Sequence, residues 1–242
     1  MADEGLERAR ICVPIVAKTD EEIINQVEVI LKKNQKKKID MAEFRADYYE
    51  ALNNFDMLGT IMTDIHDRLC RADIELLFTI RSESEGGERL SFTEPEINDI
   101  NLYVAKYKLS DLIDVELFSD KDKADKVIET SKKNGIKVIM SSHDFEKTPP
   151  VDEMIKRYKA MQERGSDIIK LAVMPHNSGD VDKLMNVVSI MYNEYADVPV
   201  VGISMGELGR RTRVDGYKYG SYITFATIGK ASAPGQVSVD EL

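Results

Sequence analysis

The sequence has few of the residues that build metal centres and disulfide frameworks. Of its 242 residues only two are cysteine, Cys12 and Cys70, and only three are histidine. The cysteines do not form a C-x-x-C pair and the histidines do not form H-E-x-x-H. The sequence therefore predicts no zinc site, no other metal site and no disulfide. Such sparse use of cysteine is typical of proteins in a reducing cytosol.

Basic charge and long apolar runs are also lacking. The 33 Lys and Arg residues are outnumbered by 43 Asp and Glu residues, which gives a net charge of −10. This charge argues against nucleic acid and anionic membranes as partners. No apolar run approaches the roughly 20 residues of a membrane span, and no apolar segment follows a basic start. We therefore expect a soluble, cytoplasmic protein.

The sequence does contain regularly alternating strand-like and helix-like segments, with 43% hydrophobic residues to fill a large core. The expected strands cover residues 10–17, 40–47, 75–81, 112–118, 136–143, 167–175, 198–205 and 222–228. The expected helices begin near residue 20 and then cover 56–70, 94–108, 121–134, 151–164, 181–195 and 206–213. Strands that alternate with helices indicate a parallel sheet, and eight such units predict an α/β fold of the (β/α)8 TIM barrel class, as a single catalytic domain over residues 1–242. Residues 238–241 have the S-x-x-E pattern of a capping box, so we expect a final helix that is truncated.

One lysine stands in the middle of the sixth expected strand, residues 167–175. Because side chains alternate along a strand, Ile169, Leu171 and Val173 share one face while Lys170 lies on the other. Burial of the ammonium would lower the pKa of Lys170. A neutral lysine is a nucleophile for ketones and aldehydes. The alternative is an edge strand whose lysine reaches water.

Polar residues also occur where other strands end, which is where barrel enzymes place their chemistry. Alternation directs Glu43 and Arg45 of the second strand to the interior, Arg81 ends the third strand, and His143 ends the fifth. Each has a structural alternative. Glu43 and Arg45 could form an interior ion pair with no role beyond that pairing, Arg81 could lie on the surface, and His143 could be structural rather than catalytic.

The remaining strands contribute acidic and apolar residues. Asp114 and Glu116 are expected to belong to a polar network, while Met205 and Phe225 would line a pocket or belong to the core. A lysine, a histidine, acids and arginines converge without any motif for a metal or a dinucleotide. This combination indicates Schiff-base chemistry on an anionic carbonyl compound.

Two loops indicate how such a compound would be held. Residues 204–213 combine glycines with arginines after the seventh strand, where barrels often bind an anion, and an arginine can bind a carboxylate bidentately. Residues 230–236 follow the eighth strand and combine small residues with Ser232 and Gln236, which suits a lid with two hydrogen-bonding groups. The alternatives are an exposed basic turn and a plain surface loop.

Taken together, these segments resemble the type I 3-dehydroquinate dehydratase family. The matching motifs are E-F-R-A-D at 43–47, T-I-R-S-E-S-E-G-G-E at 79–88, S-S-H-D-F at 141–145, K-L-A-V-M-P at 170–175, S-M-G-E-L-G-R-R-T-R at 204–213, Y-G-S-Y-I-T-F at 219–225 and A-S-A-P-G-Q at 231–236. Seven motifs in order with compatible spacing are specific, although each alone is weak. Two departures are Pro14, where some relatives have serine, and the incomplete final helix.

The resemblance implies a (β/α)8 barrel, usually a homodimer, that uses no metal or organic cofactor and converts 3-dehydroquinate to 3-dehydroshikimate and water by syn elimination in the shikimate pathway. It implies that Lys170 forms the imine, that His143 is the general acid and base, and that Glu85 orients and charges this histidine. The residues implied to contact the substrate are Glu43, Arg45, Arg81, Arg213, Ser232, Gln236, Met205 and Phe225. Two alternatives stay open: another Schiff-base lyase, such as an aldolase, or a sugar-acid-binding barrel without activity.

Overall fold

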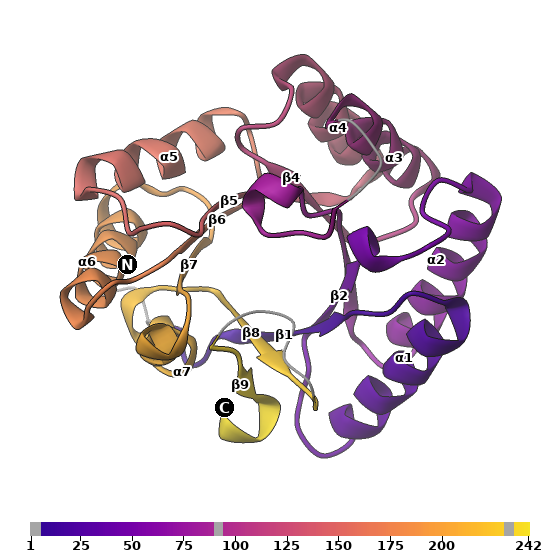
Figure 1. Ribbon diagram of the computed structural model, residues 1–242, viewed down its shortest axis with the longest axis horizontal. Coiled ribbons are helices and arrows are strands. Elements are labelled where there is room, and N and C mark those ends of the chain that lie inside the picture. The colour runs from indigo at the N-terminus through magenta and orange to yellow at the C-terminus, as the bar shows by residue number, and fades with distance from the viewer. Residues whose placement is uncertain (1–5, 90–93, 230–234) are drawn as a thin grey trace. The chain divides into compact units, whose positions relative to one another are not determined.

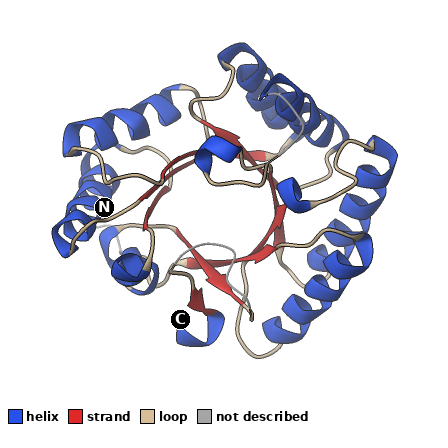
Figure 2. Ribbon diagram, viewed as in Figure 1, coloured by secondary structure: helices blue, strands red, loops and turns tan. Residues whose placement is uncertain are grey.

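The computed structural model describes residues 6–89, 94–229 and 235–242. Along these residues, strands alternate with helices (Figures 1 and 2). The chain divides into two compact units, one of residues Met1–Cys12 and Met140–Leu242 and one of residues Val13–Ile139. They are referred to below as the 140–242 unit and the 13–139 unit. Strands β1 (Arg10–Ile15) and β5 (Lys137–Asp144) run from one unit into the other.

Among the described residues of the 13–139 unit, three strands lie entirely within the unit and pair in parallel. Its strands are β2 (Met41–Arg45), β3 (Glu75–Thr79) and β4 (Leu112–Glu116), and its helices are α1 (Asp20–Asn34), α2 (Phe55–Cys70), α3 (Glu94–Tyr107) and α4 (Lys121–Asn134). The register of β2 with β3 runs from Met41 opposite Glu75 to Arg45 opposite Thr79. Because the strands are parallel, their carboxyl ends lie together, and the 3-10 turns η1 (Ala46–Tyr48) and η2 (Glu83–Glu85) follow at those ends.

Local sequence explains where these helices begin. Thr19 and Glu22 form a capping box at the start of α1, and the side chains of Asn54 and Asp120 cap α2 and α4 by accepting a main-chain N–H of the first turn. Such caps satisfy donors that have no partner within the helix.

The 140–242 unit contains the second half of the chain. Its strands beside β5 are β6 (Ile168–Val173), β7 (Val200–Ser204), β8 (Ile223–Thr227) and the short β9 (Val237–Ser238), and its helices are α5 (Val151–Glu163), α6 (Ser178–Ile190) and α7 (Arg210–Val214). Strand β6 lies between β5 and β7, while β8 pairs with β1 in parallel, with Arg10 opposite Ile223. Among the described helices, none is both long and apolar enough to cross a membrane.

The expected elements occur with small shifts at their ends. The second strand ends at Arg45 rather than Asp47, because the 3-10 turn η1 begins at Ala46, and the third strand ends at Thr79 rather than Arg81. The capping box at Ser238 is present, and it opens the 3-10 turn η6 (Val239–Glu241). The assignment of residues 1–242 to a single domain stays a prediction.

Gly202 on β7 lies very close to side chains of α5 and α6. A Cβ atom there would lie 2.2 Å from Cγ2 of Val188 and 3.2 Å from the hydroxyl of Tyr158. Tyr158 is buried and donates to the carbonyl of Val201 at 2.9 Å. We therefore expect Gly202→Ala to lower the free energy of unfolding by about 1–3 kcal/mol through overpacking. Urea unfolding measures it, and an unchanged midpoint would show that this contact has room to relax.

Candidate active site

Lys170 is buried in a central strand of the 140–242 unit. Every residue of β6 is buried, and Lys170 itself is only 5% exposed. Its register partner on β7 is Val201, and its Nζ atom lies 4.3 Å from the centroid of the Phe225 ring on β8. The prediction of a buried lysine is confirmed, and the alternative of an edge strand with a solvated lysine is wrong.

His143 lies near the end of β5, beside β6, and is half-buried. The main-chain N–H of Met174 donates to the carbonyl of Asp144 at 2.9 Å, which fixes how the two strand ends are aligned. Continued along two regular parallel strands, this alignment puts Ser141 opposite Lys170. His143 is then two residues further along on the same face as Lys170.

The turn after His143 is held by its own side chains and by the end of β6. Oδ1 of Asp144 accepts the main-chain N–H groups of Glu146 at 3.2 Å and Lys147 at 3.0 Å. The hydroxyl of Thr148 donates to the carbonyl of Met174 at 3.0 Å. These bonds tie the chain beyond His143 to the strand that carries Lys170.

Arg213 on α7 is a buried cation, 3% exposed. Its Nη1 donates to the carbonyl of Phe225 at 3.2 Å, and the hydroxyl of Thr224 donates to the carbonyl of Arg213 at 2.8 Å. Burial lowers the pKa of Arg213 to about 10, so the guanidinium stays charged at neutral pH. A buried cation of this kind is suited to an anionic group of a ligand.

The other predicted residues of this unit lie on adjacent segments. Met205 follows β7 and is buried, and its N–H donates to the carbonyl of Val173 at 2.8 Å. Gln236 is half-buried and follows Gly235, where a Cβ atom would lie 2.1 Å from the carbonyl oxygen of Gly206. Ser232 lies outside the described residues.

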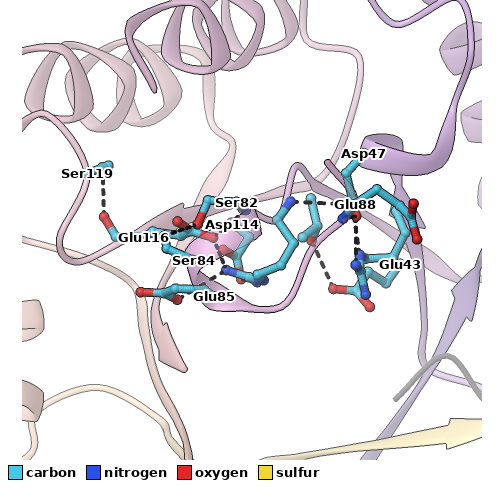
Figure 3. Close-up of polar contacts among 12 residues, drawn as sticks. Glu43, Asp47, Ser82, Ser84, Glu85, Glu88, Asp114, Glu116 and Ser119 are labelled. Atoms are coloured by element: carbon cyan, nitrogen blue, oxygen red, sulfur yellow. Dashed lines mark hydrogen bonds and ion pairs between the residues drawn. The ribbon is translucent and has the colours of Figure 1, made fainter. Parts of the chain in front are cut away.

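The 13–139 unit brings the remaining predicted residues into one polar cluster, and Figure 3 shows its carboxylates Glu43, Asp47, Glu85, Asp114 and Glu116. The two arginines of this cluster, Arg45 and Arg81, are both buried. Nη2 of Arg81 lies 2.9 Å from Oδ2 of Asp114, and its Nη1 lies 2.8 Å from Oε1 of Glu116 and 3.7 Å from Oε2 of Glu85. Although burial alone would lower the pKa of Arg81, the charges of these three carboxylates raise it. Arg81 is 4% exposed, so the alternative of a surface arginine is wrong.

Arg45 in the same cluster pairs with Asp47. Its Nε and Nη2 donate to Oδ1 and Oδ2 of Asp47 at 2.8 and 2.7 Å. Oε1 of Glu43 instead accepts the hydroxyl of Thr79 at 3.0 Å. The alternative in which Glu43 and Arg45 form an ion pair with no role beyond that pairing is therefore wrong. The sequence did not indicate the pairing of Asp47 with Arg45, because it does not show which strand-end carboxylate binds this arginine.

Within residues 6–89, 94–229 and 235–242, no group of three or more His, Cys, Asp or Glu side chains is placed to hold a metal ion. The described residues thus include a buried lysine on the strand next to that of His143 in one unit, and two buried arginines paired with carboxylates in the other.

The chain is similar to one family over nearly its whole length. The family model of type I 3-dehydroquinase matches residues 11–242. The 3-dehydroquinate dehydratase of Alkaliphilus oremlandii is 39% identical over 99% of this chain and 90% of its own. That of Enterococcus faecalis is 40% identical over 98% of this chain and 91% of its own.

A solved structure is similar to the same extent. It is the type I 3-dehydroquinate dehydratase of Clostridium difficile with covalently modified comenic acid, which is 38% identical and has a TM-score of 0.90, covering 98% of this chain and 91% of its own. This similarity and the alternation of strands and helices confirm the predicted fold class, an α/β fold of the (β/α)8 barrel type.

Proposed function

Because the chain belongs to the type I 3-dehydroquinase family, we propose that it dehydrates 3-dehydroquinate to 3-dehydroshikimate through an imine on Lys170. The observation that carries this mechanism is the burial of Lys170 on the strand beside His143. Burial disfavours the ammonium form of Lys170, which cannot attack a carbonyl. The contact with the Phe225 ring acts in the opposite direction, because an aromatic face attracts a cation. The covalently modified comenic acid in the Clostridium difficile relative also supports a covalent step.

The proposed reaction begins when neutral Lys170 attacks the C3 ketone to give a carbinolamine. With the uptake of one proton from solvent, the carbinolamine oxygen leaves as water and a protonated imine remains. The imine draws electrons from the ring and acidifies the C2 hydrogen, which His143 removes to give an enamine. The electron pair of the enamine then expels the C1 hydroxyl, which takes a proton from His143 and leaves as water. Hydrolysis of the protonated imine releases 3-dehydroshikimate, returns one proton to solvent and restores neutral Lys170. One histidine serves both proton transfers because syn elimination occurs on one face of the ring.

The other predicted residues are proposed to hold the substrate and to set the histidine. Arg213 binds the carboxylate, Glu85 orients and charges His143, and Ser232 and Gln236 close over the ligand. The residues proposed to contact the substrate hydroxyls and ring, or to line the site with apolar surface, are Glu43, Arg45, Arg81, Met205 and Phe225. The resemblance of the motifs and the burial of Arg213, Arg45 and Arg81 support these roles.

We also propose that the protein is a cytoplasmic homodimer in the shikimate pathway that needs no metal or organic cofactor. The family and the net charge of −10 support this, and the same charge disfavours nucleic acid and membranes as partners.

Arg213→Met is expected to weaken substrate binding and to stabilise the protein without substrate. Because burial lowers the pKa of Arg213 from its usual value to about 10, the folded state holds this proton less tightly than the unfolded state. The stability cost is therefore fully present below about pH 10, and it disappears as the pH rises from there through the pKa of arginine in the unfolded chain. At pH 7 the variant should gain about 1–3 kcal/mol of unfolding free energy, while KM rises at least about 100-fold. Thermal unfolding and steady-state kinetics measure the two effects, and an unchanged KM would remove Arg213 from the site.

Turnover separates the proposed reaction from its alternatives. Incubation of the protein with 3-dehydroquinate should produce the ultraviolet absorbance of the conjugated enone of 3-dehydroshikimate. A binding barrel would saturate with 3-dehydroquinate without producing this absorbance, and an aldolase would release products of carbon–carbon cleavage. Either result would contradict the proposed function.

A further inference from the structure

Two carboxylates, one buried and one half-buried, hold the turn that carries Glu85. This turn, referred to below as the Glu85 turn, comprises residues 82–88 and includes η2. Asp47, in η1 after β2, and Glu116, at the end of β4, accept hydrogen bonds from its two ends (Figure 3). Neither carboxylate has a role in the proposed chemistry.

Asp47 uses both of its oxygens for this purpose and is only 3% exposed. Oδ1 accepts the main-chain N–H of Arg81 at 3.3 Å, immediately before the turn, and Oδ2 accepts that of Glu88 at 3.2 Å, at its end. Each oxygen also accepts one N–H of the Arg45 guanidinium. An asparagine could not replace this pattern, because its amide nitrogen would face two donors.

Glu116 holds the other side of the turn through one oxygen. Its Oε1 accepts the main-chain N–H of Ser82 at 2.9 Å and Nη1 of Arg81 at 2.8 Å. The same Nη1 is 3.7 Å from Oε2 of Glu85, so Glu116 fixes both the start of the turn and the cation beside Glu85.

The turn leaves little room for movement between these two supports. The N–H of Gly87 donates to the carbonyl of Ser82 at 2.8 Å, which closes the turn. A Cβ atom at Gly87 would lie 2.0 Å from the carbonyl oxygen of Arg81, so any side chain there would push the turn away from Arg81.

We propose that Asp47 and Glu116 are positioning residues, which place Glu85 for its action on His143 by bonding both ends of the Glu85 turn. The inference rests on the proposed function, because it gives Glu85 that action. A displacement of about 1 Å in a supporting group is enough to lower catalysis substantially. Two charged acceptors on three main-chain N–H groups supply the rigidity that a short exposed turn lacks.

Hydrogen exchange tests the physical part of the inference independently of activity. In Asp47→Asn, exchange of the amides of residues 81–88 is expected to rise at least about tenfold. Glu116→Ala should have a similar effect near Ser82, whereas Glu116→Gln should have a smaller one because its carbonyl oxygen can still accept both bonds. The control is Asp120→Ala, which removes the N-cap of α4 in the same unit. Unchanged exchange in Asp47→Asn and Glu116→Ala would overturn the proposal.

A double-mutant cycle tests the catalytic part. Glu85→Gln should move the acid limb of the kcat–pH profile to lower pH, because the carboxylate favours the imidazolium form of its histidine. Asp47→Asn should move that limb in the same direction, and should add no further shift when Glu85 is already replaced. A loss of kcat that is equal at all pH values would show that Asp47 serves stability alone, and shifts that add would show that Asp47 acts independently of Glu85. Either result would overturn the positioning role.

A second variant covers the case in which Asp47→Asn does not fold. Gly87→Ala displaces the turn without removing a charge, and it should reproduce the pH shift and lose it in the Glu85→Gln background. If Glu85→Gln itself leaves the profile unchanged, the action on His143 is refuted and the catalytic role of Asp47 with it. The exchange rates would still show whether the two carboxylates hold the turn, so the two failures are distinguishable.

Discussion

Lys170→Ala is expected to lower kcat by at least about four orders of magnitude, because no other group in the proposed mechanism can form the imine. Without the imine the C2 hydrogen is not acidified, and His143 alone cannot remove it at a useful rate. Binding should persist, since the proposed contacts of Arg213 and the polar cluster are unchanged. Progress curves at high enzyme concentration and calorimetric titration with 3-dehydroquinate measure the two quantities.

The burial of Lys170 requires a control for packing. Lys170→Met keeps most of the side-chain volume, so its kcat should fall as far as that of the alanine variant if the amine matters and the volume does not. Lys159→Met is the matched control on α5, because Nζ of Lys159 also lies over an aromatic ring, 3.7 Å from the centroid of Tyr195. It should keep full activity. Substantial dehydratase activity in Lys170→Met would refute the imine.

His143→Ala is expected to lower kcat by about 10²–10⁴-fold, the range of general acid–base catalysis. The imine should still form, because its formation depends first on the amine of Lys170. The variant should therefore accumulate the covalent intermediate instead of releasing product. Intact-protein mass spectrometry after reduction of the mixture measures this accumulation.

A second histidine of the same unit provides the comparison. Nε2 of His176 lies 2.6 Å from the carbonyl oxygen of Glu146, in the turn that follows His143. His176→Ala removes a histidine from the same region without removing the proposed acid and base, so kcat should change by less than about threefold. If His143→Ala kept its activity and His176→Ala lost it, the assignment of the general acid and base would be wrong.

Much of this arrangement follows from strand alternation in the sequence. Lys170 and His143 occupy regular strands, where a period of two residues fixes the face on which each side chain lies. The same rule correctly indicated that Glu43 and Arg45 are buried, and the burial of Arg81 agrees with its expected place at the end of an inner row. Regular elements were predictable because their spacing is a property of the backbone.

The contacts beyond the strand ends were not predictable in the same way. Asp47 lies in a 3-10 turn rather than a strand, and three of its four donors come from Arg45 and Arg81, with the fourth from Glu88. Main-chain donors carry no residue-type signal in the sequence, so the role of a carboxylate that binds them cannot be inferred from a motif. The approach of Gly235 to Gly206 is a further example, since it depends on where two loops meet.

The most direct test of the imine on Lys170 is borohydride reduction of the protein during turnover of 3-dehydroquinate, followed by peptide mass spectrometry. A reduced ligand adduct is expected on the peptide that contains Lys170, increased in His143→Ala and absent in Lys170→Met. Unmodified Lys170 in a protein that converts 3-dehydroquinate under the same conditions, or an adduct on a different lysine, would contradict it.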